Sequence, residues 1–241
     1  MPSAEPLLIL SGATTGLPRN GYEPKLIEAA AVVLVPGGAG GLTIAGPTNG
    51  RWSRTIGQAA ADLLAPQAQP AKRIHGISDA EILSSPSVDG VAADFAKWLA
   101  RVQSLLGQAG FQVRTWHVWN NSFWLRHFDQ PPWSGPPGTP MFNLQLGRCA
   151  MDWTAAALLA INKNTRTKTG KVRSTGLKRA FDSYRTVAPG LDWNLGGADH
   201  RALPQACRVA QMVVLSSQID IPVEKVSHDD LMRLTDPYGG Y

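Results

Sequence analysis

The segment LLILSGATTG, residues 7–16, joins four aliphatic residues to a polar turn that contains two glycines. Such a run, ended by Ser11-Gly12, is typical of a short buried strand. A longer apolar run, LIEAAAVVL at residues 26–34, continues to Val35 and is stopped by Pro36-Gly37. The two segments therefore predict two buried strands with a turn of Thr, Gly, Pro and Asn between them.

The rest of the chain favours helices over strands. Apolar spacing predicts a helix over residues 88–106, with Ser87 as its N-terminal cap. We expect a ragged hairpin over 37–56, a loop at 58–72, a strand at 113–118, a short helix at 120–128, a Pro/Gly loop at 131–140, and helices at 144–161, 174–184 and 201–217. Strands first, then helices with a strand between them, indicate an α/β fold.

Length and composition predict one globular domain with many turns. The chain has 241 residues, of which 44% are hydrophobic and 17% charged, with 24 Gly and 18 Pro. This composition excludes a coiled coil and global disorder. We place the domain at residues 1–228 and a flexible C-terminal tail at 229–241, whose composition is that of a mobile terminus.

The two cysteines and the absence of long apolar stretches indicate the compartment. Cys149 and Cys207 are too few for a disulfide framework and lack the spacing of a zinc site, which favours a reducing environment. The N-terminus lacks the basic region of a signal peptide, and no apolar stretch approaches 18 residues. We therefore expect a cytoplasmic protein without a membrane partner.

Five blocks follow one another in an order that is typical of one enzyme family. They are SGATTG (11–16), LIEAAAVVL (26–34), RIHGISDAEI (73–82), WNNSFWLRHF (119–128) and ADHRALPQA (198–206). The chain resembles the DnaQ-like 3′–5′ exonucleases of the ribonuclease-H-like superfamily. Their blocks are D-x-E-T-T-G, I-I-E-x-x-A-V, G-I-S or G-I-T, H/Y-N-x-x-F-D and H-R-A-L-x-D-A.

The resemblance covers about residues 5–217, and two further segments, 148–159 and 174–184, look like the helices that precede the family's last block. It implies a single α/β domain with a ribonuclease-H-like mixed five-stranded sheet flanked by helices.

The family's catalytic acids are missing from this chain. In the family, four carboxylates hold two divalent metal ions that activate water and stabilise the leaving oxygen, and a histidine acts as general base. The histidine is retained as His200. The four matching acid positions hold Ser11, Ala13, Trp124 and Gln205. Because hard cations need anionic oxygen ligands, the resemblance implies a catalytically degenerate member that uses no metal and no other cofactor.

The resemblance also implies a nucleotide pocket. Its expected nucleotide-binding residues are Thr14, Thr15, Gly16, His75, Asn120 and Phe123. For the first three the alternative is a turn kept for folding, in which Gly16 supplies a positive φ.

Two further residues of the matching blocks each allow more than one interpretation. His200 is either a catalytic general acid or base, or a group that binds phosphate when it is protonated, or it has no function at the start of a helix that Asp199 caps. Trp124 either packs in the core or offers its indole to a base.

A basic stretch is the strongest local charge signal. NKNTRTKTGKVRSTGLKRA, residues 162–180, holds seven basic residues and no acid, in a chain of net charge +5. We expect phosphate binding there rather than a solvated loop. The expected phosphate contacts are Lys163, Arg166, Lys168, Lys171 and Arg173.

The sequence therefore predicts an inactive exonuclease-like protein that binds nucleic acid, as a single-stranded end or a nucleotide, with DNA preferred to RNA. A function in DNA replication, repair or modification, with a protein partner from that machinery, is expected. One alternative is a metal-independent transferase or base-modification enzyme that reuses the pocket around His200 with Asn120 or Asn121. The other alternative is a scaffold that docks a polymerase or another protein.

Overall fold

The computed structural model describes residues 5–18, 21–37, 41–46, 49–135, 138–141, 143–174, 176–192 and 200–219. Asp199 and the expected C-terminal tail at 229–241 lie outside these ranges. In the part of the chain that the structure describes, no helix is both long and apolar enough to cross a bilayer.

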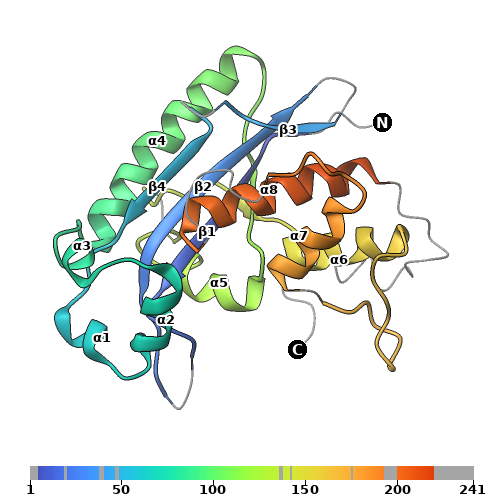
Figure 1. Ribbon diagram of the computed structural model, residues 1–241. Coiled ribbons are helices and arrows are strands. Elements are labelled where there is room, and N and C mark those ends of the chain that lie inside the picture. The colour runs from blue at the N-terminus through green and yellow to red at the C-terminus, as the bar shows by residue number, and fades with distance from the viewer. Residues whose placement is uncertain are drawn as a thin grey trace.

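A mixed sheet forms the centre of the molecule (Figure 1). Its strand order is β3-β2-β1-β5-β6. Its strands are β1 (Leu7–Thr14), β2 (Leu26–Pro36), β3 (Leu42–Ile44), β4 (Arg51–Thr55), β5 (Thr115–His117) and β6 (Gln145–Leu146). β1 is antiparallel to β2 and parallel to β5, and β5 is parallel to β6. β3 and β4 pair with successive parts of β2, so they share one strand position. The predicted mixed five-stranded sheet is confirmed.

Helices cover both faces of this sheet. They are α1 (Ala60–Leu64), α2 (Ala68–His75), α3 (Asp79–Leu83), α4 (Val88–Gln108), α5 (Asn121–Phe128), α6 (Ala150–Ala160), α7 (Leu177–Arg185) and α8 (Ala202–Gln218). Leu8 and Leu10 of β1 share one buried cluster with Phe95 of α4, whereas Leu7 and Ile9 share another with residues of α8. Alternate residues of a strand point to opposite faces, so β1 is buried between α4 and α8 (Figure 1).

Two local predictions were wrong. Residues 58–72 contain α1 and the start of α2 rather than a loop, because Leu63 and Ala68 are buried and Pro70 stands in the first turn of α2, where proline is tolerated. Residues 144–161 begin with β6, and only 150–160 are helical. Leu144 and Leu146 are too few apolar residues to distinguish a strand from a helix by their spacing.

Candidate nucleic-acid site

The end of β1 carries two of the four positions that the resemblance assigns to catalytic acids. Ser11 pairs with Ala30 of β2, and Ala13 pairs with Glu28. Partners across an antiparallel ladder share a face and lie close together. The Glu28 carboxylate therefore belongs to the same face as Ser11 and Ala13, the face covered by α8.

Glu28 is held by the start of α8 and is only 4% exposed. One carboxylate oxygen accepts a hydrogen bond from Arg201 Nε at 2.9 Å, and the other accepts one from the Ala202 backbone N–H at 2.7 Å. Arg201 Nη2 also donates to Glu81 of α3 at 2.9 Å. Glu28 thus caps α8 and is neutralised by Arg201, which ties β2, α3 and α8 together.

Burial is the largest influence on the Glu28 carboxyl and raises its pKa, while the Ala202 amide and Arg201 act in the opposite direction. Burial alone would lower the pKa of Arg201, but the carboxylates of Glu28 and Glu81 raise it. The guanidinium is therefore a permanent positive charge beside Glu28.

Trp124, at the third acid position, is packed in the core. Its side chain is 8% exposed and belongs to the buried cluster that includes Leu8, Leu10 and Phe128. A Cβ added to Gly12 would lie 2.9 Å from Trp124 Cζ3, so the indole lies against the backbone of β1. Gly12 points to the face opposite Ser11 and Ala13. This geometry favours packing and leaves little indole surface for a base.

Gln205, at the fourth position, donates from Nε2 to the His200 carbonyl oxygen at 3.2 Å, and His200 is exposed before the start of α8. A hydroxyl, a methyl, an indole and an amide supply no anionic oxygen, so the residues at these positions do not fit a pair of divalent cations. Across the described ranges, no three His, Cys, Asp or Glu side chains are placed to hold a metal ion.

Thr15 and His75 are brought together by the fold. They line a common cavity of about 10 Å³, which at that size holds no more than a water molecule. Thr15 Oγ1 accepts hydrogen bonds from the Tyr22 hydroxyl at 2.5 Å and the Lys25 N–H at 2.9 Å. His75 Nδ1 accepts one from the Ile77 N–H at 3.0 Å, and burial lowers the His75 pKa. Both side chains are thus engaged by the fold itself.

The turn that follows β1 is closed by its own contacts. Thr14 Oγ1 donates to the Gly16 carbonyl at 2.8 Å. Gly16 does not have the positive φ that the folding interpretation expected. Instead, a Cβ there would lie 2.8 Å from the Gln67 carbonyl, so glycine permits close approach of the α1–α2 connection. The next residue, Leu17, is 57% exposed, which the sequence did not indicate.

Asn120 and Phe123 stand together at the start of α5. The Asn120 carbonyl oxygen Oδ1 accepts from Ser122 Oγ at 2.7 Å and caps the helix through the Phe123 N–H at 3.4 Å. The half-buried Phe123 ring meets Trp124 edge to face at 4.8 Å between centroids, and Arg126 lies 5.8 Å from the ring centroid. An aromatic ring beside a guanidinium is a surface on which a nucleic-acid base can stack.

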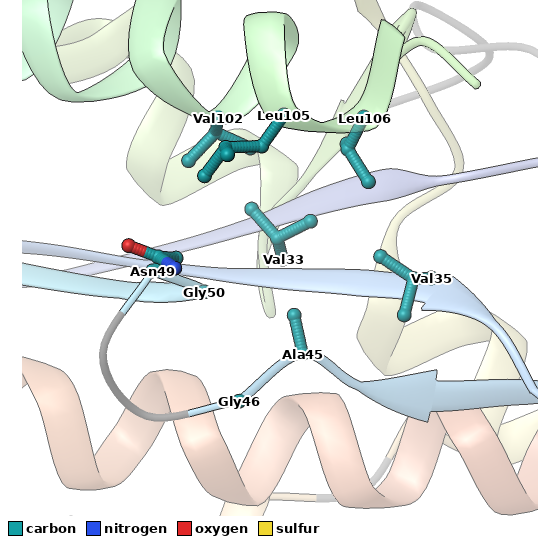
Figure 2. Close-up of a pocket in the computed structure, with 9 residues that line it drawn as sticks. All are labelled: Val33, Val35, Ala45, Gly46, Asn49, Gly50, Val102, Leu105 and Leu106. Carbon is teal, nitrogen blue, oxygen red and sulfur yellow. The ribbon is translucent and has the colours of Figure 1, made fainter. Parts of the chain in front are cut away.

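The basic residues 163–173 do not join these groups. They form the connection between α6 and α7, which projects on the side of α5 away from α1–α3 (Figure 1). A separate apolar cavity of about 150 Å³ lies where β3 gives way to β4, under α4, and contains none of the predicted site residues (Figure 2).

Comparison with solved structures gives the fold. A full-length 3′-exonuclease matches over 90% of this chain with a TM-score of 0.58 at 13% identity. The nuclease domain of 3′hExo, a DEDDh family member, matches with a TM-score of 0.58 at 12% identity over 90% of this chain and 94% of that domain. Cell-death related nuclease 4 matches over 88% of this chain with a TM-score of 0.54 at 14% identity.

The chain spans 62% of the full-length 3′-exonuclease and 64% of cell-death related nuclease 4. No family model and no curated protein sequence matches it. At these identities the similarity shows the architecture alone. The chain has the ribonuclease-H-like fold of the DEDDh 3′-exonucleases.

Proposed function

We propose that this protein binds nucleic acid, as a single-stranded end or a nucleotide, and does not hydrolyse it with metal ions. The observation that carries the proposal is the lack, among the described residues, of a free carboxylate on the face of β1 that contains Ser11 and Ala13. Ser11 and Ala13 bring no charge, and the carboxylate beside them, Glu28, is neutralised by Arg201 and used as a helix cap. Two-metal hydrolysis needs several anionic ligands at one point.

Nucleic acid as the ligand is supported by the solved relatives and by the surface at α5. The nuclease domain of 3′hExo was solved with rAMP bound, and a further structure, with a TM-score of 0.58, concerns 3′-end specific recognition of a histone mRNA stem-loop by a 3′-exonuclease. In this chain Phe123 and Arg126 supply a partly exposed ring and a cation on α5, beside Trp124, which packs against Gly12 of β1.

The test is equilibrium binding of a fluorescent single-stranded oligonucleotide, followed by anisotropy in EDTA at low salt. The protein is expected to bind it saturably, with DNA bound more tightly than RNA of the same sequence. Phe123→Leu is expected to weaken binding about tenfold, since stacking of one base contributes about 1–3 kcal/mol. Phe111→Leu is the matched control, because Phe111 is 38% exposed on the connection after α4, outside the site. No saturable binding of either polymer would overturn the proposal.

A further inference from the structure

The basic connection between α6 and α7 is an ordered β-hairpin. Arg166 and Val172 form an antiparallel bridge, and the Thr167 N–H donates to the Lys171 carbonyl at 2.7 Å. Gly170 has φ +81°, which completes a three-residue turn in the way that glycine allows. The hairpin therefore presents its side chains on a fixed backbone.

A second set of contacts anchors the base of the hairpin to α6. Asn164 Nδ2 donates to the Ala155 carbonyl at 3.1 Å and to the Arg173 carbonyl at 2.8 Å. The Lys163 N–H donates to the Leu158 carbonyl at 2.7 Å. Because both strands of the hairpin are tied to the helix, less conformational entropy is lost when a ligand binds its side chains.

Some basic side chains of residues 162–180 have partners within the protein. Arg166 Nη1 donates to the Gly170 carbonyl at 2.6 Å and so stabilises the turn, and Lys178 of α7 forms an ion pair with Asp182 at 2.9 Å. In contrast, Lys163, Lys168 and Lys171 are exposed and form no ion pair with any described carboxylate. Three lysines on one rigid hairpin remain available for an external anion.

The local charge is not offset by the surrounding sequence. Between Asp152 and Asp182 the chain contains no acidic residue. Like charges held close together on a rigid frame repel one another, and a polyanion relieves that repulsion while releasing its own counterions. Small ammonium charges on flexible stems suit phosphate oxygens without reading a base.

We infer that Lys163, Lys168 and Lys171 form a second contact surface, a phosphate clamp for the backbone of the strand whose end lies at α5 and β1. The inference rests on the proposed function and adds the class of ligand: a strand long enough to reach past its terminal nucleotide to the hairpin. The hairpin projects on the far side of α5 from α1–α3 (Figure 1), so in this proposal the two surfaces contact different nucleotides of one strand. Two contacts on one strand reinforce each other through effective concentration.

The experiment measures anisotropy for a series of oligothymidylates of increasing length, each over a range of salt concentrations. Affinity of the unaltered protein is expected to rise with length and then level off. The triple variant Lys163→Gln/Lys168→Gln/Lys171→Gln is expected to lose most of that rise while binding the shortest strands unchanged. Its log–log salt slope on long strands should be less steep by about 2, since each phosphate contact on a single strand contributes about 0.7.

A control variant removes equal charge from another face. Lys97→Gln/Arg101→Gln/Arg114→Gln alters exposed residues on α4 and before β5 and should leave the slope within about 0.7 of that of the unaltered protein. An equal effect of the two triple variants would overturn the inference, as would an unchanged length dependence in the hairpin variant. Equal competition by polyglutamate of matched charge would overturn the assignment to nucleic acid.

These outcomes separate the two proposals. If the proposed function is wrong, even the unaltered protein fails to bind short strands, and Phe123→Leu changes nothing. If only the clamp is wrong, Phe123→Leu still weakens binding while the hairpin variant does not.

Discussion

Replacing Arg201 by methionine tests whether the ion pair at the end of β1 is an essential part of the fold. The side chain of Glu28 is 5% exposed and that of Arg201 is 30% exposed. Breaking a buried pair from one side costs about 3–5 kcal/mol, because the remaining charge is left without its partner. Water reaches the guanidinium and the Ala202 amide still caps Glu28, so we expect the low end, about 3 kcal/mol. The exposed pair with Glu81 adds at most about 1 kcal/mol.

The pH dependence and a second substitution make this prediction specific. Without Arg201 the pKa of Glu28 rises further above its ordinary value near 4.5. The folded variant then binds a proton more strongly than the unfolded chain, so its destabilisation should shrink as the pH falls towards 4.5. Urea denaturation measures the free energy of unfolding at each pH. Adding Glu28→Gln should recover about 1 kcal/mol or more at pH 7. The reasoning is refuted if Arg201→Met is neutral, or if the double variant is no more stable than the single one.

Two further predictions concern buried rings. Trp124→Ala should lower the free energy of unfolding by about 3–5 kcal/mol in urea denaturation while the folded variant keeps its affinity for oligothymidylate. Unchanged stability with weaker binding would instead assign the indole to base stacking. Burial lowers the pKa of His117 from 6.5 to about 4. Since the unfolded chain then binds more protons at this residue between these pH values, His117 alone should lower the free energy of unfolding by about 3 kcal/mol from pH 7 to pH 4. In His117→Gln that part of the decrease should disappear, and an identical decrease in the variant contradicts the interpretation.

The aliphatic runs predicted the two central strands because burial on both faces leaves an uninterrupted apolar signal. They did not predict that β1 continues from Ser11 to Thr14, since that extension depends on backbone pairing with β2 rather than on side chains. The helix over 68–75 was missed because its buried residues, Ala68 and His75, are not a strong apolar pattern.

The family blocks located the candidate site but not its contacts. Arg201 and Glu28 are 173 positions apart, so no local pattern could have paired them. Trp124 allowed two interpretations in the sequence, and its burial and its position against Gly12 in the structure favour packing. The basic composition of residues 162–180 identified a charged segment but not its hairpin. The hairpin depends on the turn at Gly170 and on the hydrogen bonds of Asn164, and composition does not reveal either.

The most direct test of the proposed loss of metal-dependent hydrolysis is a denaturing gel of a 5′-labelled single strand incubated with excess protein and manganese or magnesium. Parallel anisotropy has to show that the strand is bound under the same conditions. The uncharged side chains at Ser11, Ala13, Trp124 and Gln205 predict that the bound strand keeps its full length. Progressive shortening from the 3′ end that increases with metal concentration would contradict it. A separately purified Phe123→Leu variant serves as the control for contaminating nucleases, because true hydrolysis by this protein should decrease in that variant as much as its binding does.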